Sequence, residues 1–269
     1  MMIKFENVVL PSAEQWRAII LGARNPMNSW EKSDSYIGCD GGACDDCCNL
    51  NYGERCADEY RNCVIGPNDL DLMRRLAAGG PVHAKYRRMI TVYVDITAPL
   101  YWWKEFDTCK VGTVTNSCST MHKIAEKEFT LEDFSCEHLL NADSMDWSSK
   151  DINCSAAWPS GIVNLPEGDL VNTPFMPMDI LELTIKSLNR CRKVYLKTKD
   201  KKYWWQMIQL LPSSYNQKRT AMMNYEVLAN IYKSRRNHRL DEWSVGFIEF
   251  IKSLPYSELI TYEDNKNVG

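Results

Sequence analysis

Residues 89–96, MITVYVDI, constrain the fold most, because they form the clearest strand in the sequence. Their β-branched side chains and tyrosine are typical of a strand. Residues 2–10 alternate apolar and polar side chains and predict a second strand. The second half of the chain is mainly helical. This order predicts an α+β fold, with helices packed on a mostly antiparallel sheet, and we interpret residues 1–269 as a single domain.

Helices are predicted where apolar residues recur at helical spacing. Ser12 precedes such a pattern over residues 13–23. Asn68 or Asp69 can cap a helix over residues 70–77. Further helices are predicted over residues 100–120, 180–193, 202–211, 218–235 and 240–254. The aromatic residues that open the helix at residue 100 are interpreted as core rather than as a cofactor site; they are Tyr101, Trp102, Trp103 and Phe106.

Two stretches lack a regular pattern. Residues 25–64 are rich in Gly, Asp, Asn and Cys, and we interpret about 36–64 as a Cys-rich insertion. Residues 137–177 are dominated by Asp, Ser, Asn, Gly and Pro, and they predict an irregular, lid-like insertion.

Cysteine usage points to thiols or a metal rather than to disulfides. The chain has 11 cysteines and no signal peptide is recognisable, so a disulfide framework is not expected. Cys44 and Cys47 have the spacing of a metal-ligand pair, and neighbouring cysteines can complete four thiolates. Structural zinc, an iron–sulfur cluster and free or redox-active thiols are all open interpretations. The candidate zinc ligands are Cys39, Cys44, Cys47 and Cys56, with Cys63 as an alternative.

The net charge excludes few classes of protein and indicates no particular kind of binding partner. The net charge is −3, so nothing global indicates nucleic acid or an anionic membrane. No apolar run approaches the ~20 residues that a membrane span needs, and the N-terminus lacks the layout of a secretory signal. We therefore expect a cytoplasmic protein with neither a membrane nor a nucleic-acid partner.

The first of two patterned blocks covers residues 66–123. It contains a helix, a glycine turn with His83, the strand 89–96, an Ala-Pro pair and then a longer helix. This order resembles the flavin-dependent thymidylate synthases, whose helix ends in Q-x-x-R-H-R-x-x-S-x-N-x-x-S-x-R. The spacing matches without a gap, but the identities differ. Glu105 stands at the glutamine, Thr108, Cys109 and Lys110 at the Arg-His-Arg, Thr113 and Cys118 at the two serines, and Thr120 at the last arginine.

The second block covers residues 211–243 and resembles the family's leucine-proline followed by N-x-R-x-L-x-x-F-x-x-L-R. Glu226 replaces the first arginine of that motif. A histidine and a tryptophan follow in the family, and His238 and Trp243 match them approximately. The matching residues are Leu211, Pro212, Asn224, Leu228, Ile231 and Arg235.

The resemblance implies an enzyme that methylates dUMP or a related pyrimidine nucleotide. It implies FAD as cofactor, NADPH as electron source, methylenetetrahydrofolate as carbon donor and a homotetramer. In the family, arginines hold the phosphates, because a guanidinium contacts phosphate in a two-pronged manner. The replaced arginines therefore predict weakened phosphate binding. Residues 213–220, near a predicted helix start, offer hydroxyls, amides and two cations as a replacement.

Candidate site residues follow from these positions. Arg235 matches the family arginine that contacts the pyrimidine, and Cys118 is a second candidate for catalysis. The cofactor-binding candidates are His83, Lys110, Asn224 and Asn230. The substrate-binding candidates are Thr113, Asn116, Thr120, His122, Lys123, Lys218 and Arg219. Each has a structural alternative, such as a surface arginine, an inert buried thiol, a helix cap or a solvated basic turn.

Three functions are consistent with the sequence. The first is a flavin-dependent enzyme acting on a pyrimidine nucleotide. The second is a non-catalytic member of the same fold that binds a nucleotide or a partner, which the replaced arginines favour. The third is a zinc-clipped interaction module unrelated to the family.

Overall fold

The computed structural model describes residues 3–38, 62–109, 111–141, 160–164, 170–174 and 176–262. The chain divides into two compact units. The sheet unit consists of Ile3–Thr97, Lys104–Ser117 and Lys218–Gly269, and the hairpin unit consists of Met1–Met2, Ala98–Trp103 and Cys118–Gln217.

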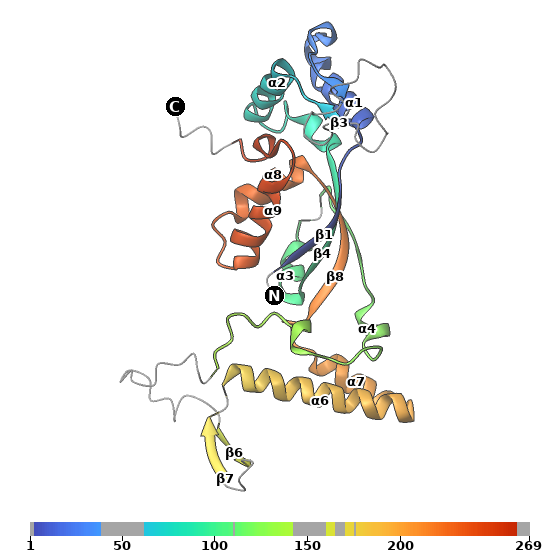
Figure 1. Ribbon diagram of the computed structural model, residues 1–269, viewed down its shortest axis with the longest axis vertical. Coiled ribbons are helices and arrows are strands. Elements are labelled where there is room, and N and C mark those ends of the chain that lie inside the picture. Colours follow the sequence, from blue (N-terminus) through green and yellow to red (C-terminus); the bar gives the residue numbers. More distant parts are fainter. Residues whose placement is uncertain are drawn as a thin grey trace, which may run out of the picture. The chain divides into compact units, whose positions relative to one another are not determined.

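A four-stranded sheet with the strand order β1-β4-β8-β5 organises the sheet unit. Figure 1 labels β1, β4 and β8, which run side by side. Strand β4 pairs antiparallel with β1, and β5 pairs antiparallel with β8. Every second side chain of β4 is buried, as the two-residue period of a strand requires. The α+β class is therefore confirmed. The strands are β1 (Lys4–Val9), β4 (Thr91–Pro99), β5 (Val114–Ser117) and β8 (Asn216–Asn224).

The predicted helix over residues 218–235 is half wrong. Its first part is strand β8, and only Tyr225–Arg235 forms a helix, α8. Strand β8 lies between β4 and β5, and its Ala221 and Met223 are completely buried. Pairing on both sides therefore overrides the local helical pattern.

The predicted helix over residues 100–120 is also too long. Helix α3 covers only Leu100–Phe106, and strand β5 follows. Gly112 has a φ of +80°, which L side chains rarely adopt, and it reverses the chain between the two elements. A Cβ at this position would lie 2.8 Å from Cγ2 of Val227, so the reversal also packs tightly on α8.

Helix α1 (Ala13–Arg24) confirms the prediction for residues 13–23. Ser12 caps it, and the side chains of Ser12 and Gln15 bond each other's backbone in a capping box. Helix α2 covers Pro67–Ala78, with Gly66 as its N-cap. The predicted caps Asn68 and Asp69 are wrong, because both lie inside the first turn. Their backbone amides instead donate to the carboxylate of Asp34, from a distant loop.

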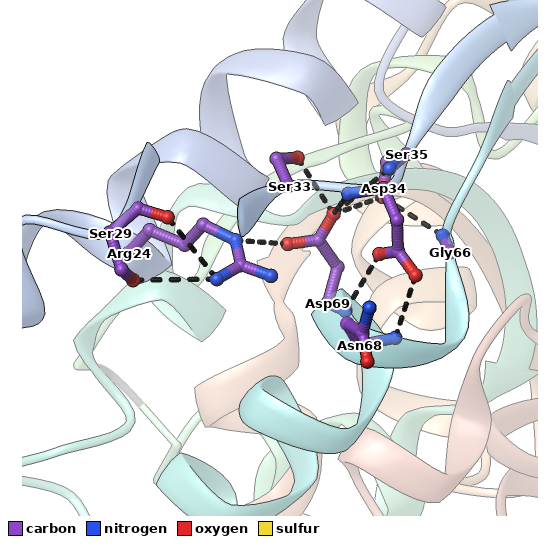
Figure 2. A network of polar contacts seen from close by, with 8 residues as sticks. All are labelled: Arg24, Ser29, Ser33, Asp34, Ser35, Gly66, Asn68 and Asp69. Carbon is purple, nitrogen blue, oxygen red and sulfur yellow. Dashed lines mark hydrogen bonds and ion pairs between the residues drawn. The ribbon is translucent and has the colours of Figure 1, made fainter. Parts of the chain in front are cut away.

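A buried ion pair ties α1 to α2 (Figure 2). Arg24 Nε donates to one carboxylate oxygen of Asp69, and its Nη1 lies 3.3 Å from both the backbone oxygen and the hydroxyl of Ser29. The other Asp69 oxygen accepts from the hydroxyls of Ser33 (2.7 Å) and Ser35 (2.6 Å). Burial pushes the Asp69 pKa up, but these hydrogen bonds from Ser35, Ser33 and Arg24 outweigh it, so its pKa is lowered.

Strands β2 (Tyr36–Gly38) and β3 (Asn62–Val64) form an antiparallel pair at the edges of the predicted Cys-rich insertion. Gly38 is opposite Asn62, so the chain leaves and returns at neighbouring positions. The candidate zinc ligands Cys39, Cys44, Cys47 and Cys56 lie outside the described residues. Zinc therefore stays a prediction.

The hairpin unit is built on two helices joined by a short turn. The helices are α6 (Pro177–Thr198) and α7 (Lys201–Leu210), which confirm the predictions for residues 180–193 and 202–211. Their apolar faces share a core with the segment 124–134. Its buried members are Ile124, Phe129, Phe134, Leu181, Ile185, Leu188 and Met207. The unit also contains α4 (Thr120–Lys123) and a β6–β7 pair (Ser160–Asn164 with Leu170–Pro174) inside the predicted irregular insertion.

The remaining elements agree with the sequence in outline. The predicted helix over residues 240–254 is a π-helical turn, Glu242–Phe247, that continues into α9, Ile248–Ser253. Trp102, Trp103 and Phe106 are buried, which confirms that they belong to the core. Among the described residues, no helix is long and apolar enough to cross a membrane. Short 3-10 turns lie at Asn25–Met27, Trp30–Lys32, Lys85–Met89, Leu131–Asp133 and Ser257–Leu259.

Candidate functional site

Arg235 is the centre of a polar cluster in the sheet unit. Its Nη2 lies 3.0 Å from Oε1 of Glu105, and the same oxygen lies 3.1 Å from Nε2 of His238. The other oxygen of Glu105 accepts from the indole Nε1 of Trp243 at 3.0 Å. The guanidinium also lies over the Trp243 ring, 5.4 Å from its centroid. One carboxylate therefore joins two side chains that can carry positive charge and one indole.

Three elements and one connecting segment supply this cluster, and an aromatic layer supports it. Arg235 ends α8, Glu105 lies in the last turn of α3, and Trp243 is the second residue of the π-helical turn. His238 lies between α8 and that turn. The Trp243 ring stacks on Phe106 at 6.3 Å and an interplanar angle of 10°, and it packs against Phe247. Trp243, Phe106 and Phe247 are buried. The cluster therefore rests on a buried aromatic layer, and the side chains of Arg235 and Glu105 remain partly exposed.

The guanidinium of Arg235 is only partly satisfied. Its side chain is 22% exposed, and that of Glu105 is 26% exposed. Its Nε is buried and, within the described part of the chain, has no hydrogen-bond acceptor. A buried donor without an acceptor costs about 1–3 kcal/mol. A ligand oxygen could approach the exposed part of this side chain, whereas Nε itself is not accessible from solvent.

The nearby Cys109 is not an activated nucleophile. Burial raises the pKa of its thiol, and the positive charge of Arg235 only partly opposes this effect. A raised pKa keeps the thiol protonated near neutral pH, and the thiol is the less nucleophilic form.

The two motif blocks of the sequence meet in this cluster. Glu105 stands at the glutamine of the first motif, and Arg235 ends the second. Trp243 and Glu105, which share a hydrogen bond, are 138 residues apart in the sequence. The cluster thus brings together positions that the sequence connects only through the family pattern.

Other candidates in the sheet unit have structural contacts of their own. The Thr113 hydroxyl donates to the backbone oxygen of Cys109. Asn224 caps α8, because its side-chain oxygen accepts from the amide of Val227 at 3.0 Å. Asn116 lies on β5 opposite Thr220, His83 and Asn230 are exposed, and Lys110 lies outside the described residues.

The two cations of residues 213–220 lie on strand β8, so their predicted place near a helix start is wrong. Lys218 lies 3.1 Å from Asp95 and 3.6 Å from Glu6, and Arg219 lies 2.8 Å from Asp107. The hydroxyl of Thr220, then Asn7 and Lys218, lower the pKa of Asp95 to about 2. Both cations are thus already matched by carboxylates, and phosphate would have to displace these.

The remaining candidates belong to the hairpin unit. Thr120 accepts from the side-chain amide of Gln217 at 2.8 Å, and Lys123 pairs with Glu126. Cys118 and His122 are exposed. Within the described ranges, no group of three His, Cys, Asp or Glu side chains is arranged to hold a metal ion.

The altered second motif has a structural explanation at Glu226. Arg87 donates through Nε to Glu226 at 2.9 Å and through Nη1 to the backbone oxygen of Leu259 at 3.1 Å. Both charged side chains are buried. An acid in place of the family's arginine is therefore matched by a buried arginine from another element, and this position serves the core.

Glu105, His238 and Trp243 were not predicted to be site residues. In the sequence, Glu105 was identified only as the residue that replaces the motif glutamine, and His238 and Trp243 were identified only as approximate matches to the family motif. Their position within the motif blocks was the available signal.

Comparison with solved structures identifies the fold. Two structures of the flavin-dependent thymidylate synthase ThyX from Helicobacter pylori, complexed with FAD and dUMP, match with a TM-score of 0.54 and 14% identity. The matches cover 98% of this chain and 99% and 98% of those chains. A UMP/dUMP methylase, PolB from Streptomyces cacaoi bound with 5-Br dUMP, matches with a TM-score of 0.50 and 14% identity, over 98% of this chain and 95% of that one.

No protein-family model and no curated protein matches the sequence. The chain nevertheless has the fold of the flavin-dependent thymidylate synthases. The resemblance inferred from motif spacing is confirmed at the level of the fold.

Proposed function

We propose that the protein is a divergent member of the flavin-dependent thymidylate synthase family that binds a uridine nucleotide at Arg235 and methylates its pyrimidine with the help of a flavin. The contact between Glu105 and Arg235 carries this proposal. It joins the two motif blocks at the residue that the resemblance assigns to the pyrimidine. The fold likeness over nearly the whole chain supports the same assignment.

Arg235 suits a pyrimidine carbonyl better than a phosphate. One edge of its guanidinium faces Glu105, which balances the positive charge, and its Nε has no acceptor among the described residues. A fixed donor beside the ring oxygen stabilises the negative charge that builds up there when the ring is activated for attack. The Trp243 ring below the guanidinium holds this donor in place.

The flavin-assigned residues fit contacts to the polar edge of a flavin. His83 and Asn230 are exposed, and Asn224 uses its side-chain oxygen for the helix cap while its amide nitrogen can still donate. These residues would hold the ring system, and a bound flavin would supply the electrons for reduction at the transferred carbon.

A second function follows from the charges. Glu105 offsets Arg235, and both Lys218 and Arg219 are paired with acids. These pairings favour a protein that keeps the fold and a nucleotide site but does not turn over its substrate.

The first test is the visible spectrum of the purified protein with added FAD, before and after dUMP. Oxidised flavin absorbs near about 370 and 450 nm, and bands that shift when dUMP is added support a shared flavin and nucleotide site. Release of tritium from C5 of labelled dUMP then separates an enzyme from a binding protein. Unchanged spectra of added FAD, together with no binding of dUMP in calorimetry, would contradict both functions.

A further inference from the structure

A concentration of positive charge in the hairpin unit is not used by the proposed function. Residues 190–202 contain seven Lys and Arg and one Asp, whereas the whole chain has a net charge of −3. This segment is the end of α6, the turn and the start of α7. The charge of the chain is therefore segregated, and its total conceals a basic region.

Three of these cations, together with Lys186, form a stripe along α6. Its members recur at intervals of three or four residues, which places them on one face of a helix. All four are exposed, whereas the opposite face contributes apolar side chains to the core. The stripe is roughly 16 Å long at the rise of an α-helix. It consists of Lys186, Arg190, Lys193 and Lys197.

The stripe is poorly neutralised. Within the described ranges, Arg190, Lys193 and Lys197 have no acidic partner. Lys186 lies 4.0 Å from Glu182, but both side chains are more than half exposed, so this pair is weak. The nearby Arg192 is different, because it bonds the backbone oxygens of Ala125 and Glu126 and serves the fold. The stripe thus presents charge to solvent that the described residues of the unit hardly neutralise.

Aromatic rings alternate with lysines at the turn end of the same hairpin. Lys199 lies 5.7 Å from the ring centroid of Tyr195, and Lys202 lies 5.0 Å from that of Tyr203. Lys201 lies 5.9 Å from the Trp205 ring, which is 45% exposed. An exposed ring beside a cation, such as Trp205 beside Lys201, provides a stacking platform next to a phosphate-binding charge.

We propose that the α6–α7 hairpin is a binding surface for single-stranded nucleic acid. The lysines and arginine of the stripe meet the phosphates, and Trp205 offers a face on which a base stacks. An anionic membrane fits less well. A helix that binds a membrane surface inserts an apolar face, and the apolar face of α6, with Leu181, Ile185 and Leu188, is already buried in the core.

The test compares two fourfold variants that change the net charge equally. One replaces Lys186, Arg190, Lys193 and Lys197 by Ala, and the other replaces the exposed sheet-unit residues Lys85, Arg88, Lys104 and Lys252 by Ala. Binding of a fluorescent oligothymidylate of about 20 nucleotides is followed by anisotropy over a salt series. The stripe variant should bind at least roughly tenfold more weakly, and its slope of log K against log salt should fall by roughly 3. The sheet-unit variant should stay near wild type.

A second pair of variants tests stacking. Trp205→Ala should weaken binding by roughly tenfold at each salt concentration without changing the slope. Trp30→Ala removes a similarly exposed tryptophan of the sheet unit (47% exposed) and should have no effect.

Three results would overturn the proposal. The first is equal weakening by the two fourfold variants, which would indicate a general charge effect. The second is no binding of oligonucleotide by wild type while vesicles of phosphatidylserine are bound. The third is a stripe variant that changes only the oligomeric state in sedimentation, which would make the face an interface between copies.

Discussion

Two arginine–carboxylate pairs of the sheet unit differ in how far they are exposed to solvent, and this difference separates a structural pair from a candidate binding site. Arg24 and Asp69 are both buried, and both Asp69 oxygens and two Arg24 nitrogens have partners. Arg235 and Glu105 are about a quarter exposed, and Arg235 Nε has no acceptor in the described part of the chain. The buried pair holds the fold together, whereas the partly exposed pair is also accessible to a ligand.

The largest expected effect is on the free energy of unfolding, at the buried pair of Arg24 and Asp69. Asp69→Asn leaves the buried Arg24 without its counter-charge. It should lower the free energy of unfolding by about 3–5 kcal/mol in urea denaturation followed by tryptophan fluorescence. Asp71→Asn is the matched control, because its pair with Arg75 on the same helix is more than 60% exposed on both sides. The control should cost under about 0.5 kcal/mol. Equal losses would mean that burial does not distinguish the pairs.

The second effect is on nucleotide binding, at the partly exposed pair of Arg235 and Glu105. Arg235→Ala should weaken dUMP binding in calorimetry by roughly tenfold to a hundredfold, because it removes a charged donor to the pyrimidine. Unfolding should change by less than about 1 kcal/mol. Arg236→Ala is the control, since Arg236 lies over the Tyr232 ring, away from Glu105. If both variants bind dUMP like wild type, Arg235 is not part of the nucleotide site.

A smaller effect is expected at Glu105. Glu105→Gln keeps an oxygen acceptor for Trp243 but removes the negative charge beside Arg235. Affinity for dUMP should rise by a few fold, worth ~0.5–1 kcal/mol, because the guanidinium then faces the nucleotide with its full charge. Glu258→Gln, which disrupts the partly exposed pair with Arg74, should leave the affinity unchanged. Weaker binding by Glu105→Gln would show that the carboxylate only positions the arginine.

The smallest effect is a difference in acid sensitivity. The pKa of Asp69 is lowered from its ordinary value of 3.8, so its stabilising contribution is complete above that value and is lost as pH falls through the lower folded pKa. The stability difference between wild type and Asp69→Asn should therefore shrink below about pH 4. Urea midpoints of both proteins at several pH values measure it. A difference that stays constant down to about pH 2.5 would place the stabilising effect elsewhere than in the Asp69 charge.

Local signals predicted much of the fold. The Ser12 cap and the strand predicted at residues 89–96 each depend on side chains that are close together in the sequence. Both are present in the structure. Strand β8 could not be predicted in this way, because its polar and methionine-rich sequence also suits a helix. Only its pairing with β4 and β5, which come from distant parts of the chain, decides for a strand.

The candidate site was predicted less completely for a similar reason. Motif spacing indicated Arg235, but no local pattern shows that Glu105 would face it, because that contact depends on how α3 and α8 pack. The net charge is limited in a different way, because a sum over the chain cannot show how charge is distributed, as in the basic stripe on α6. The expectation of no nucleic-acid partner stays a prediction, which the oligonucleotide experiment tests.

The short β2–β3 pair has a consequence for how this chain can change over time. Gly38 and Asn62 are direct partners, so the path between them begins and ends at one place on the sheet unit. Closing a longer path at such a place costs little, since the entropy of closure rises only slowly with its length. The β2–β3 pair is therefore a position that tolerates insertions. Residues between Gly38 and Asn62 can be added, removed or exchanged, and a new binding function can be acquired there, while the strands, helices and Arg235 cluster of the sheet unit keep their contacts.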